Sequence, residues 1–241
     1  MFRFTHSWAL ALAAGLVASP ALAQEVKDPT AYFDQLNKAA QAAASVQSIN
    51  NLKQIAIAFH IHHDVANQLP GNIVDKDGKP LLSWRVAILP YIEQDNVYKQ
   101  FKLDEPWDSA NNKKLLDQMP KIYRNPRFQK ADDKASVTYY QGFTGEGGVI
   151  GAKKLNLTDI TNVNGTSNTV LAVEAGAPVP WTKPEDLAHD LKKPLPKLAG
   201  AGGNFIAAFC DGHVQRIPAK TDEKVLRCMI QWNNKEAFKL P

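Results

Sequence analysis

The sequence predicts an α+β fold in which a long N-terminal helix packs on an antiparallel β-sheet. Residues 48–67 place apolar side chains at helical spacing, and four segments between residues 136 and 218 are rich in β-branched and aromatic residues. The pair Asp211-Gly212 stands directly between the last two of these segments, which is a strong hairpin signal. Short helices and long loops are expected to be inserted between the long helix and the sheet.

The long helix is expected to have one wide apolar face over residues 48–67. At a helical turn of about 100° per residue, this face contains Leu52, Ile55, Ala56, Phe59, His63 and Ala66. Upstream, residues 30–47 contain no Gly or Pro and are rich in Ala, so the helix is expected to extend back almost to Pro29. A helix over residues 30–67 would be about 55 Å long, longer than a small domain is wide. Its first half is therefore expected to protrude.

Short elements are expected between the long helix and the sheet. They are a helix stop at residues 68–71, a turn at Asp77-Gly78, two short helices over residues 84–101, another over residues 111–118 and an exposed loop over residues 128–135. The strands are expected over residues 136–143, 168–175, 204–210 and 213–218. Residues 176–203 are rich in Pro and Gly and predict an irregular surface loop. A last helix is expected over residues 222–232, with Thr221 as its N-cap.

The strand over residues 204–210 is expected to lie inside the sheet. Both of its alternating sets are apolar: Phe205, Ala207 and Phe209 on one side, and Ile206, Ala208 and Cys210 on the other. A strand of this kind is covered on both faces. We expect the long helix to be one of the two covers.

The first 23 residues have the pattern of a secretory signal peptide. They contain Arg3, an apolar segment over residues 8–18 and an Ala-Leu-Ala site before Gln24. The apolar segment is shorter than the roughly 20 residues of a membrane span, although an uncleaved anchor is the alternative. We expect an exported protein, periplasmic or extracellular, with no stable membrane span after cleavage. Its parts are a signal peptide (1–23), an Ala-rich protruding helical segment (24–47) and a single globular domain (48–241).

Charge and cysteine content narrow the classes of partner. The chain has a formal net charge of +4 without a block of five or more cations, so no nucleic-acid partner is expected. Two cysteines, Cys210 and Cys228, occur in a compartment that permits disulfides. Whether they pair is open, with two small buried thiols as the alternative.

Few residues suggest chemistry. The run HIHHD contains His60 and Asp64 at i and i+4, the only two of its members that point the same way, and we regard them as a weak metal candidate. The alternative is a solvated pair on the helix flank. Glu174 ends an apolar strand, where a carboxylate bonded to backbone or to an Arg is commoner than a catalytic one. No nucleophile, phosphate-loop or dinucleotide motif occurs, so no catalytic residue and no cofactor are expected.

Several blocks of the chain carry a resemblance to a known family. They are NNLKQIAIAFHIHHD, the long segment from DKDGKPLLSW to KIYRNP, GTSNTVLAVEAG followed by VPWTKPEDL, and GGNFIAAFCDGHVQRI. Together they resemble the family called domain of unknown function 1559, also catalogued as bacterial solute-binding family 10. That family is abundant in planctomycetes and is associated with prepilin-like proteins that carry an H-x9-DG signature. The resemblance implies a pseudopilin-like fold and no established enzymatic activity.

This chain departs from the family pattern at three places. Many members begin with a prepilin site and a membrane-inserted helix, whereas this chain has a signal peptide and a polar, Ala-rich segment there. The histidine of the H-x9-DG signature falls at Ala201, so only Asp211-Gly212 of that signature is present. Relatives often carry two cysteines at the positions of Ser48 and Asn125, and both are absent here, as expected if they pair in those relatives.

Three classes of function compete. The first is a structural or interaction module of the cell envelope that binds an envelope protein or a second copy of itself through the N-terminal helix, where Tyr32 and Leu36 belong to a narrow apolar stripe. The second is a periplasmic solute-binding protein with a cleft lined by Trp84, Trp107 and Trp181. The third is an enzyme, for which the sequence contains no motif. We expect the first.

Overall fold

The computed structural model describes residues 29–129, 136–151 and 155–241. The expected signal peptide lies outside these residues. The chain forms two compact units, residues 1–40 and residues 41–241. In the first unit, the described residues form the opening turns of helix α1 (Pro29–Ala66), and the rest of this helix belongs to the second unit. Pro29 begins the helix, a position where its missing N–H costs no hydrogen bond.

Helix α1 is a single helix of 38 residues, which confirms the long helix predicted over residues 30–67. It ends where Asn67 adopts a left-handed conformation (φ 52°) and its N–H bonds to the His63 carbonyl at 2.7 Å. Leu52, Ile55 and Phe59 are completely buried, as the predicted apolar face requires. Ala66 was expected on that face but is exposed at the last position of the helix.

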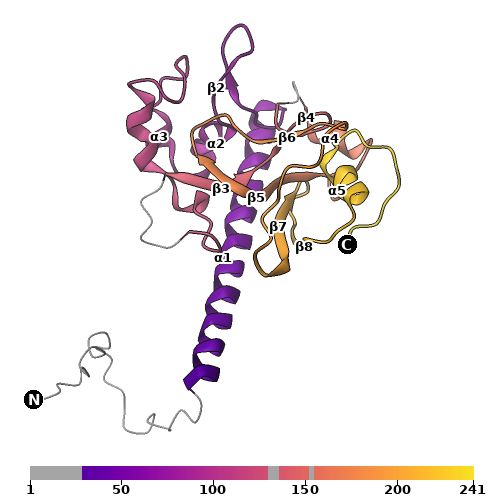
Figure 1. Ribbon diagram of the computed structural model, residues 1–241. Helices are drawn as coiled ribbons and strands as arrows, with labels where there is room; N and C mark the ends of the chain where they lie inside the picture. The colour runs from indigo at the N-terminus through magenta and orange to yellow at the C-terminus, as the bar shows by residue number, and fades with distance from the viewer. Residues whose placement is uncertain (1–28, 130–135, 152–154) are drawn as a thin grey trace, which may run out of the picture. The chain divides into compact units, whose positions relative to one another are not determined.

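The second unit contains a four-stranded antiparallel sheet with the order β3-β5-β7-β8 (Figure 1). Its strands are β3 (Val137–Gln141), β5 (Val170–Pro180), β7 (Asn204–Phe209) and β8 (Val214–Pro218). Strand β7 lies between β5 and β8, which confirms that this strand is internal. The Asp211-Gly212 turn joins β7 to β8 as predicted, with Gly212 at φ 91°.

The side chains on the two sides of strand β7 pack into two different hydrophobic cores. Ile206 and Ala208 belong to the core that contains the buried residues of α1. Phe205 and Phe209 belong to the opposite core, together with Met229 of helix α5 (Glu223–Ile230). The sheet is therefore covered by α1 on one face and by α5 on the other. Asp222 caps α5 by accepting from the Lys224 N–H at 2.8 Å, so the prediction of Thr221 as N-cap was wrong by one residue.

Short elements connect α1 to the sheet. They are β1 (Ile73–Val74), β2 (Pro80–Leu82), α2 (Trp84–Ala87), η2 (Leu89–Ile92), α3 (Asp95–Tyr98), η3 (Asn112–Gln118) and η4 (Lys121–Tyr123). Strands β1 and β2 form a hairpin around Asp77-Gly78, as expected. The segment over residues 84–101 forms three short helices where two were predicted, since the chain turns again at Glu93 in a left-handed conformation.

The Pro- and Gly-rich segment over residues 176–203 is more regular than predicted. Strand β5 continues through it to Pro180, and β6 (Leu187–His189) pairs in parallel with β4 (Phe143–Gly145). The prolines of this extension, Pro178 and Pro180, lie beyond the residues of β5 that pair with β7 (170–173) and beyond the bridge of Ala175 to Leu198, so neither has to donate a ladder bond on that edge. Helix α4 (Leu157–Thr161) precedes β5 and begins with a capping box at Asn156.

Candidate functional site

Helix α1 has a second apolar face, opposite the one buried on the sheet. Ile57, Ile61 and Val65 follow one another at intervals of four residues and are 56%, 41% and 72% exposed. Val46 lies in the same sector of the helix and is also exposed. Single exposed apolar residues are ordinary, but an aligned series of large ones marks a binding surface.

Two of the residues predicted as a partner surface, Tyr32 and Leu36, lie in the first unit, where each is 47% exposed. We call the set Val46, Ile57, Ile61 and Val65, all in the second unit, the outward face of α1. Sequence reasoning missed Ile57, Ile61 and Val65 because residues 48–67 were interpreted with a single apolar face. The signal was present as three β-branched residues at i, i+4 and i+8.

A buried carboxylate fixes how α1 lies on the sheet. Glu174 on β5 is completely buried, and each of its oxygens accepts two hydrogen bonds. Oε1 accepts from the Ser48 hydroxyl of α1 at 2.7 Å and from the Asn125 amide at 2.9 Å. Oε2 accepts from the Arg127 guanidinium and from the Ile206 N–H of β7 at 3.0 Å. All acceptor sites of the carboxylate are thus used within the protein, which identifies Glu174 as a structural anion.

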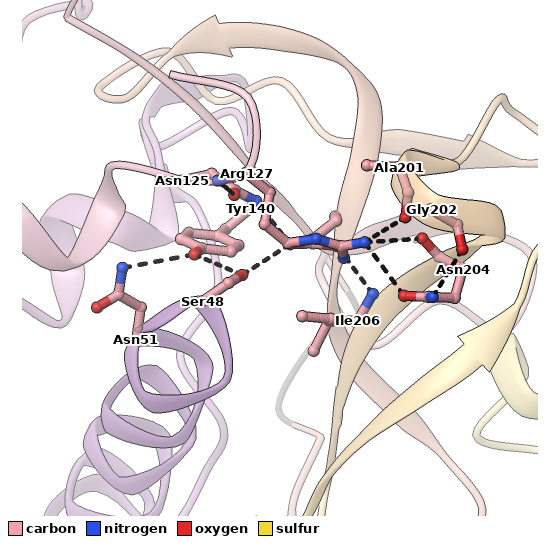
Figure 2. Close-up of polar contacts among 10 residues, drawn as sticks. Ser48, Asn51, Asn125, Arg127, Tyr140, Ala201, Gly202, Asn204 and Ile206 are labelled. Carbon is pink, nitrogen blue, oxygen red and sulfur yellow. Dashed lines mark hydrogen bonds and ion pairs between the residues drawn. The ribbon is translucent and has the colours of Figure 1, made fainter. Parts of the chain in front are cut away.

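Figure 2 shows the partners of this carboxylate converging from separate parts of the chain. We call Glu174 with Ser48, Asn125, Arg127 and Tyr140 the Glu174 centre. Arg127 also donates to the Ala201 carbonyl and to the carbonyl and side-chain oxygens of Asn204, which ties it to the start of β7. The hydrogen bonds of the Glu174 centre join α1, the strands of the sheet and the segment that contains Asn125 and Arg127. A fully bonded buried network of this kind favours a single packing arrangement of these parts.

Ser48 and Asn125 are the two positions at which the resemblance described above implies cysteines in relatives. Their side chains bond to the same oxygen atom of Glu174, so they are close neighbours in the structure. The two positions therefore meet at one place in the fold, which the Glu174 centre occupies in this chain.

Tyr140 connects the Glu174 centre to a second buried ion pair. Its hydroxyl lies 2.8 Å from the Ser48 hydroxyl, and burial raises the pKa of Tyr140 well above its usual value. Its carbonyl accepts from the Arg85 guanidinium at 2.7 and 2.9 Å, and Arg85 in turn contacts Asp186 at 2.8 Å. Burial raises the pKa of Asp186, and the charge of Arg85 opposes this rise. Tyr140 of β3 is therefore bonded to Arg85 of one ion pair through its carbonyl and to Ser48, a partner of Glu174, through its hydroxyl.

Two of the three tryptophans that were predicted to line a cleft lie in the hydrophobic core instead. Trp84 and Trp181 are completely buried, and their indole N–H groups donate to Asp186 and to the Leu116 carbonyl. Trp107 is half-buried, with Lys183 above its ring. A cavity of about 10 Å³ lies elsewhere, between the sheet and α5, and is lined by apolar residues such as Phe205 and Met229. Ligand pockets measure roughly 300–1,000 Å³.

The side chains of the histidine-rich run HIHHD have separate contacts in the structure. Asp64 lies 3.7 Å from Nδ1 of the adjacent His63, and His60 lies beside the Gly212 turn. Over residues 29–129, 136–151 and 155–241, no group of three or more His, Cys, Asp or Glu side chains could hold a metal ion. Cys210 and Cys228 are free and buried, which corresponds to the thiol alternative. Burial raises the pKa of both thiols.

Within the described part of the chain, no helix has the length and apolar content that a membrane crossing requires.

Comparisons with known proteins place the chain in a family. A model of the family described as "Protein of unknown function (DUF1559)" matches residues 37–196, which is more than half of the chain. Neither the curated proteins nor the solved structures contain a match. From this match and the sequence blocks described above, the chain belongs to the DUF1559 family.

Proposed function

We propose that this protein is an exported, non-enzymatic interaction module of the cell envelope, pseudopilin-like, which docks through the outward face of α1. The observation that carries the proposal is the pair of opposite faces on one helix. Leu52, Ile55 and Phe59 hold α1 on the sheet, while Ile57, Ile61 and Val65 remain exposed.

The Glu174 centre supports this role because it fixes the rotation of α1. Ser48 can reach Glu174 only when its side of the helix faces the sheet. The opposite side, which contains Ile57 and Ile61, is then presented to solvent. Pre-organisation of this kind lowers the entropic cost of binding a partner.

The N-terminal turns of α1 support the same role. Tyr32 and Leu36 are exposed, and an isolated Ala-rich helix of this length is only marginally stable in water. Such a segment gains stability when it packs against another helix. The proposed location outside the cytoplasm is supported by the signal-peptide pattern of the first 23 residues.

Deletion of residues 24–46 tests the proposal. The deletion keeps Ser48 and the whole Glu174 centre, so the free energy of unfolding of the remaining protein should change by less than about 1 kcal/mol. Retention of the protein in the envelope fraction of its own cells should be lost. Unfolding of the truncated protein would show that the segment is part of the core, and unchanged retention would show that docking uses another surface.

A further inference from the structure

We infer that residues 190–197, which follow β6, bind the surface of an anionic lipid bilayer. We call this segment the lysine loop. It is separate from the outward face of α1, so the inference goes beyond the proposed docking and does not depend on it. It rests on three features of the loop: a held backbone, one large exposed apolar side chain and a concentration of positive charge.

The backbone of the lysine loop is held at both ends. Arg227 of α5 donates to the Asp190 carbonyl at 3.2 Å and to the Lys193 carbonyl at 2.6 Å. At the other end, the Lys197 carbonyl accepts from the Gly176 N–H of β5 at 2.8 Å. Because these bonds already order the backbone, binding through the side chains of the loop costs little additional conformational entropy.

Leu191 supplies an apolar side chain at the surface. Its N–H donates to the Glu146 carboxylate at 2.6 Å, whereas its side chain is 54% exposed. A single exposed leucine is ordinary in itself. Next to several cations, however, it adds the apolar contact that a peripheral protein makes with the interface of a bilayer.

The cations beside Leu191 are Lys192, Lys193 and Lys197, all of which are exposed. Residues 191–197 contain no acidic residue, and Asp190, which lies 3.3 Å from Lys193, is the only anion of the loop. Each lysine close to an anionic membrane surface strengthens binding about fivefold, and salt screens this attraction.

The combination of charge and an apolar side chain favours a bilayer over other anionic partners. An acidic peptide or a polysaccharide can pair with the lysines alone, whereas a bilayer also accepts Leu191 among its headgroups. Three lysines and one leucine give weak, reversible binding. Retention in the envelope therefore still requires docking through α1, and the loop adds a second contact to it.

Sedimentation with lipid vesicles tests the charge. The expected mature chain, residues 24–241, should bind vesicles of phosphatidylglycerol and phosphatidylcholine in equal parts at low salt, and vesicles of phosphatidylcholine alone much less. Lys192→Gln/Lys193→Gln/Lys197→Gln should weaken binding to the anionic vesicles by about a hundredfold, because all three cations are lost. The substitutions leave the backbone bonds of the loop in place.

A matched control removes the same charge elsewhere. Lys113→Gln/Lys114→Gln/Lys121→Gln alters three exposed lysines of η3 and η4, so the net charge of the two triple variants is identical. The control should bind the anionic vesicles within about twofold of the unmodified chain. Equal losses in the two triple variants would overturn the inference, since attraction would then follow net charge and not the loop.

A dye at Leu191 tests the apolar contact. Leu191→Cys is labelled with a thiol-reactive dye whose fluorescence rises in apolar surroundings, and the native cysteines, Cys210 and Cys228, are buried. Fluorescence should rise when anionic vesicles are added, and the same dye on Lys113→Cys should not respond. No rise at residue 191 would overturn the placement of the loop at a bilayer interface. Ile57→Gln/Ile61→Gln should bind the vesicles like the unmodified chain, so failure of this inference is distinguishable from failure of docking through α1.

Discussion

Ser48 donates a hydrogen bond of 2.7 Å to Glu174, a residue 126 positions later in the chain, and this bond joins helix α1 to the centre of the sheet. Both side chains are completely buried. The bond fixes which side of α1 packs and, as a consequence, which side is exposed. The rotation of α1 therefore accounts both for the contacts of the Glu174 centre and for the exposure of the outward face, through which we propose docking.

Glu174→Gln should lower the free energy of unfolding by about 3–5 kcal/mol, measured by urea denaturation. The substitution keeps the shape but removes the charge that balances buried Arg127. The matched control is Glu185→Gln, which removes the same charge from an exposed pair with Lys183 and should cost less than about 1 kcal/mol. Equal losses in the two variants would contradict the role of the Glu174 centre.

Phe59→Ala should lower the free energy of unfolding by about 3–5 kcal/mol, because the ring is completely buried. The ring also packs edge-on against Trp84, with 5.1 Å between the ring centroids. His60→Ala, the next residue, should cost well under 1 kcal/mol, since His60 lies on the half-buried flank of α1. Thermal or urea unfolding compares the two variants. Similar losses at both positions would mean that the rotation of α1 differs from the one described.

The elements with strong periodic patterns were predictable from the sequence. The long helix, the internal strand β7 and the Asp211-Gly212 hairpin each depend on local spacing and turn chemistry, and each is confirmed. The extension of β5 to Pro180 was not predictable, because prolines end a strand unless one of its edges is free of ladder bonds. Only the tertiary pairing shows that free edge.

The candidate site was predictable only in part. Tyr32 and Leu36 were identified by their exposed stripe, whereas Ile57 and Ile61 were overlooked beside a wide buried face on the same helix. The Glu174 centre combines residues separated by many positions, so no local pattern indicates it. Trp84 was predicted to line a ligand surface but lies in the core. A tryptophan suits both places, because its ring can be buried while its indole N–H donates to a carboxylate, here Asp186.

His62 should make the protein less stable in mild acid. Burial lowers the pKa of His62 below its usual 6.5, although a hydrogen bond to the Gln68 carbonyl partly offsets this effect. Between the lowered pKa and 6.5 the unfolded chain binds more protons than the folded one, so stability should fall as the pH decreases through this range. His62→Asn should weaken this pH dependence in urea unfolding measured from pH 8 to pH 5. An unchanged slope would exclude His62 as its source.

Export is tested by the N-terminal residues alone. Residues 1–30, fused to a reporter that is active only outside the cytoplasm, should direct secretion. Mass spectrometry of the secreted product should find Gln24 at its N-terminus, after cleavage behind Ala23. Recovery of a product that still begins with Met1 would contradict the signal-peptide interpretation.

The most direct test of the central claim changes the outward face and leaves the fold intact. Ile57→Gln/Ile61→Gln alters two exposed residues of α1, and Ile55→Gln alters a buried neighbour as a control. The measurement is retention in the envelope fraction, together with thermal unfolding of each purified protein. The account predicts that the double variant unfolds within about 1 kcal/mol of the unmodified protein but is lost from the envelope, whereas Ile55→Gln is strongly destabilised. Full envelope retention of the stable double variant would contradict the claim that this face of α1 is the docking surface.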